Sequence, residues 1–238
     1  MNCRCLVACL ALLYFSATQS TLGQQNIATS HRAMVATVRS EATDAAVRVL
    51  QQGGNAVDAA IAAAFTLSVV DGYNSGIGGG CFILIRTPGG QLLAIDGREM
   101  APRSAKPDMF LKGGLPIPDA SEVGPLASGV PGAVAAYEMA WRAAGSKPWG
   151  ELLDDAITYA VDGFSIPEKY AERIRSKRNS LSKFPGSRDV LFDGNGEPRK
   201  AGTKLVQLDL GKTLTGIQAG GGKYFYCGPT ARLISRWM

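Results

Sequence analysis

The 238-residue sequence predicts an α+β protein, α/β in the broad sense, in which helices pack on a mainly antiparallel sheet. Several segments have apolar residues at helical spacing or are rich in Ala. Two β-type runs, in contrast, are joined by a short Pro/Gly turn, which is typical of an antiparallel hairpin. Apolar residues make up 46% of the chain and charged residues 19%, and this composition excludes a disordered chain.

The first 23 residues have the pattern of an export signal. Arg4 is followed by ten apolar residues at 6–15, too few to span a bilayer, and small residues at 21 and 23 suit a cleavage site. We therefore expect a signal peptide over 1–23 and an exported protein, periplasmic or extracellular, over 24–238, with no stable membrane span. Residues 6–9 also resemble a lipoprotein box, but most of the apolar core follows Cys9, which disfavours lipid anchoring.

Helices and one strand are predicted before the hairpin. Residues 34–37 form a short apolar run that indicates a strand. Ser40 suits a helix cap, and the helix after it should end at Gly53-Gly54. Asn55 suits the cap of a second helix. This helix is nearly all apolar between residues 59 and 70, so it should be buried on most sides.

The predicted hairpin pairs residues 81–86 with residues 91–96 across the turn at 88–90. Its first strand is apolar at nearly every position, which suits a strand covered on both faces. Residues 103–128 and 185–204 are rich in turn-forming residues. Helices are predicted from Pro131 to about Ala144, after Trp149 up to Gly163, from near Pro167, and over 208–217 and 230–238.

Histidine content excludes several kinds of chemistry. The chain has one histidine, His31, so no two-histidine metal site can form, and a Ser-His-Asp or Cys-His mechanism would require that residue. His31 lies in a polar stretch without an obvious partner, which favours a solvated or capping role.

The glycine cluster at 76–80 does not have the context of a nucleotide-binding loop. A dinucleotide fingerprint needs a strand before the glycines and a helix after them, and here that order is reversed. No Gly-Lys-Ser/Thr sequence follows, which excludes a P-loop. The alternative is a tight crossing where backbone packs on backbone.

Two further features leave alternatives open. A basic run over 173–183 indicates either an anion or nucleic-acid patch or the solvated face of a helix, and no aromatic residues interleave with it. Cys81 and Cys227 are the cysteines outside the predicted leader. They either pair or remain as two separate buried thiols.

Arg98 is the candidate binding residue. It follows a hydrophobic strand directly, and binding residues are common at strand ends. A guanidinium there can grip a carboxylate through two parallel hydrogen bonds. The alternative is a salt bridge to Asp96 or Glu99, and spacing alone does not decide between them.

An ordered set of motifs resembles the γ-glutamyltranspeptidases, also called glutathione hydrolases. Each motif is weak alone, but their order and spacing are specific, and the resemblance covers residues from about 27 to 238. The motifs are GGNAVDAA at 53–60, GIGGG at 76–80, DGREMAP at 96–102, GVPG at 129–132, WGEL at 149–152, DGF at 162–164 and YCGP at 226–229.

The resemblance implies an exported N-terminal-nucleophile hydrolase with a four-layer αββα core, made from a precursor that cleaves itself into a large and a small subunit. In such enzymes the N-terminal Thr of the small subunit attacks the γ-glutamyl amide, and its α-amino group acts as the base. The acyl group then passes to water, an amino acid or a peptide. The resemblance implies no metal or organic cofactor and no nucleic-acid partner. Arg98 matches the arginine that holds the α-carboxylate of the γ-glutamyl group.

The sequence departs from the family pattern because it lacks the nucleophile segment, the oxyanion-hole glycines and the small-subunit residues that bind the α-amino group. No Thr here is followed by Thr-His, the sequence that marks the nucleophile in this family. We therefore expect the chain to be the earlier part of a large subunit, with the nucleophilic Thr beyond Met238 and no catalytic residue of its own. The helix-like pattern at the end of the chain has no stop signal, which also favours a fragment. The alternative is a truncated, inactive exported protein that binds γ-glutamyl compounds or pairs with a separate subunit.

Overall fold

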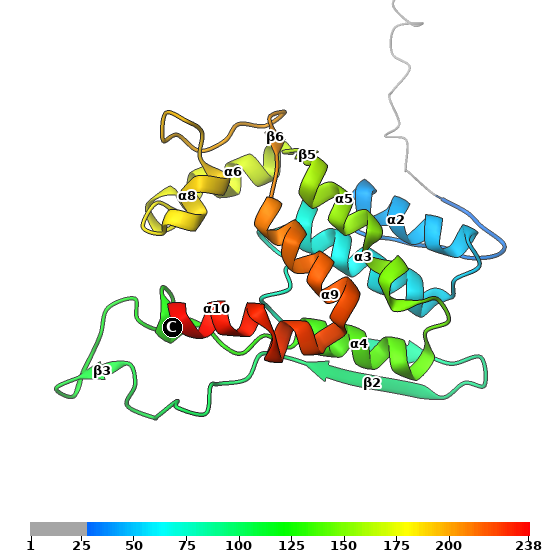
Figure 1. The fold of residues 1–238 in the computed structure, drawn as a ribbon, viewed down its shortest axis with the longest axis horizontal. Helices are drawn as coiled ribbons and strands as arrows, with labels where there is room; N and C mark the ends of the chain where they lie inside the picture. Colours follow the sequence, from blue (N-terminus) through cyan, green and yellow to red (C-terminus); the bar gives the residue numbers. More distant parts are fainter. Residues whose placement is uncertain (1–27) are drawn as a thin grey trace, which may run out of the picture. The chain divides into compact units, whose positions relative to one another are not determined.

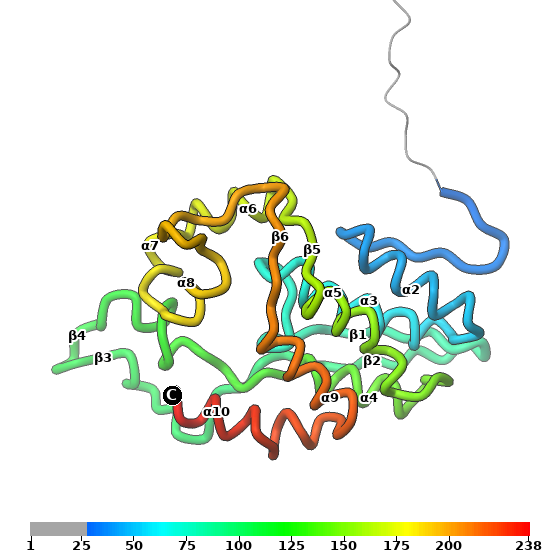
Figure 2. The backbone as a smooth tube through the Cα atoms, turned by 45° about the horizontal axis from the view of Figure 1, so that its top comes forward, coloured from blue at the N-terminus to red at the C-terminus, as the bar shows by residue number. Residues whose placement is uncertain are grey.

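The computed structural model describes residues 28–238 of the chain (Figures 1 and 2). The chain divides into two units, Met1–Met34 and Val35–Met238. In the first unit the described residues, His31 among them, are exposed. The signal peptide predicted over 1–23 lies outside the described residues. All elements below belong to the second unit.

Helix α3 (Ala56–Val70) forms the centre of the second unit. It contacts α2 (Ser40–Gln51), α4 (Ala133–Ala144) and α5 (Asp154–Asp162). Ten of its side chains are buried, Phe65 completely, which confirms the prediction of a helix covered on most sides. Asn55 caps it as predicted, because its side chain accepts hydrogen bonds from the N–H groups of Val57 and Asp58.

The predicted hairpin is present as β1 (Cys81–Arg86) and β2 (Leu92–Gly97), paired antiparallel. Helix α4 lies along β2 in Figure 1 and contacts both strands. The side chains of Phe82, Leu84 and Leu92 point away from this cover and are 67%, 71% and 65% exposed. The prediction that the first strand is covered on both faces is therefore wrong for the described chain, since helices cover only one face.

Of the C-terminal helices, α9 (Leu208–Cys227) packs against α5, α4 and a 3₁₀ helix, and α10 (Pro229–Trp237) packs against α9. The 3₁₀ helix, η2 (Trp149–Leu153), contacts α3 and α9, and the indole N–H of Trp149 donates to the carbonyl of Ile217 at 2.9 Å. Helix α9 breaks at Gly221 and continues through Cys227, so the stretch expected to separate two helices is itself helical. Helix α10 follows.

Residues 164–205 form an excursion closed at its base by two short strands. These strands, β5 (Phe164–Ser165) and β6 (Lys204–Leu205), pair antiparallel. The excursion holds α6 (Glu168–Ser176), α7 (Arg178–Leu181) and α8 (Pro185–Leu191), so the segment expected to be turns over 185–204 begins with a helix. Residues 103–128 are mostly loop, as predicted, with β3 (Leu111–Lys112), β4 (Leu115–Pro116) and η1 (Pro125–Ala127).

The fold class is α+β, as predicted, with helices on an antiparallel hairpin. Two local predictions are wrong. Residues 34–37 form no strand and pair with no strand among the described residues. The N-cap residue of α2 is Arg39, and Ser40, which was expected to cap the helix, is its first residue. Within residues 28–238, no helix has the length and apolar character needed to cross a membrane.

The two cysteines are not paired. Both thiols are free, with Cys81 half-buried and Cys227 exposed at the end of α9. Neither of the two expectations holds, because the thiols form no disulfide and Cys227 is not buried.

Candidate functional site

Arg98 lies directly after β2 with its side chain 65% exposed. Its Nε is 3.5 Å from Oε2 of Glu99, and its Cζ is 5.9 Å from the centre of the Phe82 ring. Its backbone N–H donates to the Asp96 carboxylate at 3.0 Å. The sequence left Asp96 and Glu99 as possible salt-bridge partners of Arg98, and in the structure its side chain pairs with Glu99. One edge of the guanidinium is thus held, while its remaining N–H donors face solvent and can bind a carboxylate in bidentate fashion.

Three sequence motifs that lie apart in the chain meet around Arg98. The carbonyl of Gly79 accepts hydrogen bonds from the N–H groups of Gly132 and Ala133, at 3.0 and 3.1 Å. Met100 and Val130 exchange two backbone hydrogen bonds, at 3.1 and 2.7 Å. The glycine cluster, the segment 96–102 and the segment 129–132 therefore form one structure.

The close packing of this structure requires glycine at position 80. A Cβ there would lie 2.5 Å from the carbonyl oxygen of Gly97 and 2.9 Å from both the Cα of Arg98 and Oε2 of Glu99. Contacts this short with backbone atoms do not occur without displacement of the chain. The glycine cluster is thus a place where backbone packs on backbone, the alternative that the sequence favoured over a nucleotide loop.

Glu99 connects the glycine cluster to Arg98. Its two carboxylate oxygens lie 3.3 and 2.9 Å from the positions that a Cβ would take on Gly79 and Gly80. The carboxylate therefore rests against the glycine backbone and pairs with the Nε side of Arg98. Burial, and then the charge of Glu99, raise the pKa of the Cys81 thiol, which stays protonated at neutral pH.

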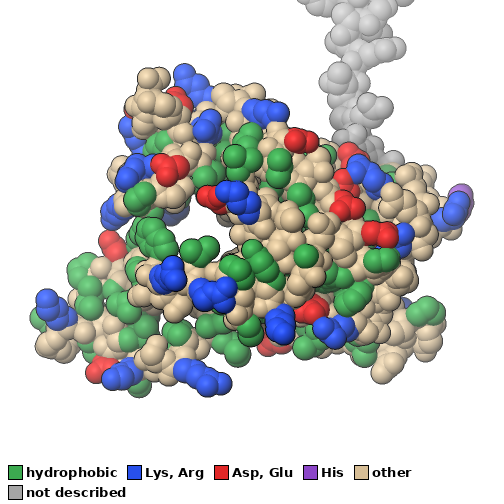
Figure 3. Space-filling view, viewed as in Figure 1, with side chains coloured by type: hydrophobic (Ala, Val, Ile, Leu, Met, Phe, Trp, Pro, Cys, Tyr) green, Lys and Arg blue, Asp and Glu red, His purple; other side chains and the backbone are tan. Residues whose placement is uncertain are grey.

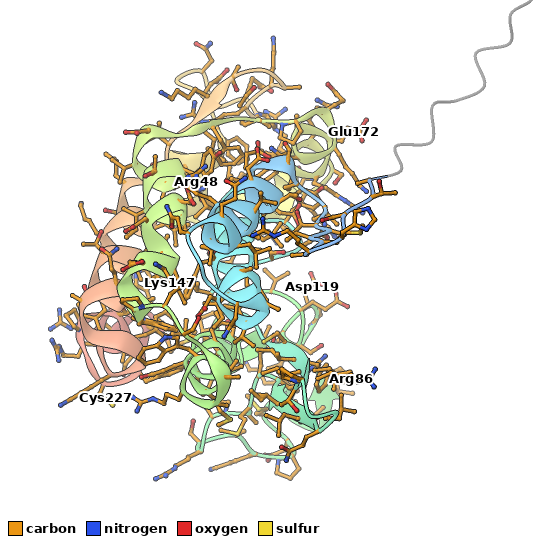
Figure 4. The ribbon with its side chains drawn as sticks, turned by 90° about the vertical axis from the view of Figure 1, so that its right-hand side faces the viewer. Arg48, Arg86, Asp119, Lys147, Glu172 and Cys227 are labelled. Carbon is orange, nitrogen blue, oxygen red and sulfur yellow. The ribbon has the colours of Figure 1, made fainter. Side chains whose placement is uncertain are left out.

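A buried carboxylate, Asp58, supports α3 and α4 behind the hairpin. It accepts hydrogen bonds from the backbone N–H of Asn55 and from the hydroxyl and N–H of Ser146, and the hydroxyl contact is 2.5 Å long. Burial alone would raise the pKa of Asp58, but these donors, with the N–H of Lys147, outweigh it and hold the pKa below its usual value. Lys147 lies in the turn after α4 (Figure 4). The sequence signal for Asp58 was its position three residues after Asn55, the spacing of a capping box.

The other residues singled out from the sequence lie elsewhere. The basic run lies on α6 and α7 and the turn after them. His31 is exposed within the unit that ends at Met34. Among residues 28–238, no three His, Cys, Asp or Glu side chains are grouped so that they could hold a metal ion. Phe82 was not predicted as a site residue, because its contact with Arg98 depends on the hairpin register.

The family of the chain is shown by its match to the sequence profile of a protein family. The profile described as Gamma-glutamyltranspeptidase matches residues 42–238. The chain belongs to the γ-glutamyltranspeptidase family. Arg98, Glu99 and the glycine segments around them all lie within the matched residues.

Individual γ-glutamyltranspeptidases agree with this assignment. The glutathione hydrolase proenzyme of Escherichia coli K12 is 39% identical over 206 residues, which are 86% of this chain and 36% of that protein. The crystal structure of the Helicobacter pylori γ-glutamyltranspeptidase matches with a TM-score of 0.86 at 37% identity, over 88% of this chain and 60% of that chain. The enzyme from Pseudomonas nitroreducens, complexed with L-DON, matches with a TM-score of 0.80 at 36% identity, over 88% of this chain and 61% of that chain.

These matches show that the fold is part of the γ-glutamyltranspeptidase fold, an N-terminal-nucleophile hydrolase fold. The chain spans about a third of the length of the curated relatives it matches, which are named as proenzymes in E. coli and Bacillus subtilis.

Proposed function

We propose that this chain is the part of a γ-glutamyltranspeptidase large subunit that holds the γ-glutamyl group of glutathione and related compounds. The observation that carries the proposal is the geometry of Arg98, whose guanidinium is exposed yet held on one edge by Glu99. A γ-glutamyl group presents a free α-carboxylate, the ligand that a guanidinium binds best. In this proposal Arg98 binds that carboxylate, and Glu99 and the glycine backbone keep Arg98 in position.

The bond-breaking step belongs to a residue that this chain does not supply. A Thr at the N-terminus of the small subunit attacks the γ-carbonyl carbon, and its own α-amino group takes the hydroxyl proton. The amide C–N bond breaks, an ester to Thr forms, and the amine leaves with the proton. Water, an amino acid or a peptide then attacks the ester and releases the γ-glutamyl product. We propose no cofactor for these steps.

The small subunit of the same precursor is the proposed partner. The uncovered face of the hairpin supports this, because exposed apolar surface of this kind marks an interface. A groove of about 810 Å³ between α3, β1 and α4 adjoins that face. We further propose that residues 1–23 are a signal peptide, that 24–238 are large-subunit residues, and that the enzyme acts in the periplasm or outside the cell.

The test is to express the complete product of the gene and to measure hydrolysis of a γ-glutamyl amide beside the 238-residue chain alone. We expect the complete product to split into two subunits and to hydrolyse the amide, and the chain alone to be inactive. Mass spectrometry should find the γ-glutamyl ester on the N-terminal Thr of the small subunit.

An inactive complete product would overturn the proposed activity. It would favour the second candidate, a non-catalytic exported protein that binds γ-glutamyl compounds or a separate subunit. The exposed face of the hairpin is compatible with that candidate too, because either reading requires a partner for Phe82 and Leu84.

A further inference from the structure

Positive charge is concentrated in one part of the molecule, residues 168–204, which we term the basic lobe. The lobe contains ten Lys or Arg and five Asp or Glu residues, a net charge of +5. Residues 28–167 and 205–238 together contain fourteen and fifteen, a net charge of −1. The lobe therefore carries all the net positive charge of the described chain. Figure 3 shows Lys and Arg side chains around this part, at the upper left.

Most of this charge is not neutralised by ion pairs within the lobe. Arg175 pairs with Glu168 and Arg178 with Glu197, at 3.1 and 2.7 Å. The remaining cations have no salt-bridge partner among the described residues, and all but Arg199 are exposed. They are Lys169, Arg173, Lys177, Lys183, Arg188, Arg199, Lys200 and Lys204.

Three arginines border one hollow of the lobe, whose volume is about 540 Å³. Arg188 donates to the carbonyl of Ser182 at 2.6 Å, and Arg199 donates through Nε to the carbonyl of Val190 at 2.8 Å. Arg178 is the third, held by its pair with Glu197. Each guanidinium is thus fixed through one nitrogen and retains further N–H donors for a ligand. Asp189 and Asp193 also border the hollow, so the hollow alone is not a strong anion site.

Among its described residues, the lobe offers a partner neither exposed large apolar side chains nor exposed aromatic rings. No large apolar side chain between 168 and 204, a stretch that the structure describes throughout, is exposed. An amphipathic membrane anchor depends on such side chains, and the lobe has none to insert. Tyr170 and Phe192 are buried and Phe184 is half-buried, so no exposed aromatic ring is available to stack on nucleic-acid bases.

The distribution of the cations favours a flexible partner. They come from α6, from α7 and the turn after it, from α8 and the loop that follows it, and from β6, rather than from a single straight element. A stiff polyanion such as a DNA duplex contacts only part of such a surface, whereas a flexible polyanion can bend to contact cations on several elements.

We propose that the basic lobe binds a flexible linear polyanion, a polymer whose repeating units carry carboxylate or phosphate groups. The site lies on elements other than those that hold Arg98, so binding does not depend on the proposed γ-glutamyl activity. Binding is electrostatic and releases counterions, so it weakens steeply with salt.

The experiment measures binding of fluorescent-labelled inorganic polyphosphate and poly-glutamate, matched in charge number, to the 238-residue chain at 50 and 200 mM NaCl. For roughly four neutralised charges, affinity should fall about 50-fold between these salt concentrations. The two polymers distinguish phosphate from carboxylate as the preferred group, and binding of either supports the proposal. Failure to bind both at 50 mM NaCl overturns it.

Two triple variants with the same net charge locate the site. The lobe variant combines Arg173→Glu, Lys177→Glu and Lys183→Glu, and the control combines Lys106→Glu, Lys112→Glu and Lys223→Glu, all at exposed positions. The lobe variant should lose at least about tenfold in affinity and the control less than about threefold.

Equal losses in the two variants would overturn the proposal. Should charge reversal unfold the lobe variant, as judged by circular dichroism, the triple Gln variant at the same positions takes its place. A 20-base-pair DNA duplex is the third probe. Tighter binding of the duplex than of either polymer would overturn the preference for a flexible polyanion.

Discussion

Gly80 gives the most demanding test of how the Arg98 site is built. In Gly80→Ala, the new Cβ would meet the carbonyl oxygen of Gly97 at 2.5 Å and the Cα of Arg98 at 2.9 Å. Both are backbone atoms, so the hairpin end must move. Overpacking of this kind costs about 1–3 kcal/mol. Alanine also lowers the conformational entropy of the unfolded chain, which stabilises the folded protein by about 0.4–1 kcal/mol. The free energy of unfolding should therefore fall by roughly 1–2 kcal/mol.

Gly78 is a matched control in the same glycine cluster, because a Cβ there would meet nothing within 4 Å. Gly78→Ala should leave stability unchanged or raise it by up to about 1 kcal/mol. Urea unfolding of both variants, followed by tryptophan fluorescence and circular dichroism, measures the difference. Equal effects of the two substitutions would refute the packing argument.

Three other predictions follow from the described contacts. Asp58→Asn should destabilise the chain by about 2–3 kcal/mol at pH 7. Because the folded-state pKa of Asp58 is lowered, its contribution is present above pH 4 and lost as the pH falls further, so urea melts of variant and wild type should converge at low pH. Iodoacetamide should label the exposed Cys227 well before Cys81, because Cys81 is half-buried and its pKa is raised. Mass spectrometry of the labelled peptides gives the order, and earlier labelling of Cys81 would contradict the prediction. Glu138→Ala should lower the free energy of unfolding by about 1 kcal/mol. The Glu138 carboxylate accepts a hydrogen bond from the N–H of Gly222 at 3.0 Å, at the point where α9 resumes after its break. An unchanged melting temperature in thermal unfolding would contradict this role.

Features set by neighbouring residues were predictable from the sequence. The Asn55 cap depends on residues within three positions, and the hairpin depends on a short turn between two β-type runs. The role of the glycine cluster was also predictable, because the order of helix and strand around it excluded a nucleotide loop. The place of Arg98 directly after a strand was also predictable, whereas its binding role stays a prediction.

Features set by distant parts of the chain were not predictable. The donors to Asp58 include Ser146, 88 residues away, and no local pattern reveals that pairing. Phe82 and Leu84 are apolar enough for a covered strand, yet nothing in residues 28–238 covers them. The apolar run at 34–37 fails as a strand for a related reason, since a strand needs a partner to satisfy its backbone.

The central claim, that Arg98 holds the α-carboxylate of the γ-glutamyl group, is tested most directly by steady-state kinetics of the complete enzyme. Arg236 is the control, an exposed arginine on α10, outside the hairpin and the groove beside it. Loss of a hydrogen-bonded charge contact is worth about 1.5–3 kcal/mol, so Arg98→Ala should raise KM for a γ-glutamyl amide about 10- to 150-fold. Arg236→Ala should leave KM unchanged. An Arg98→Ala enzyme whose KM equals that of the wild type would contradict the claim.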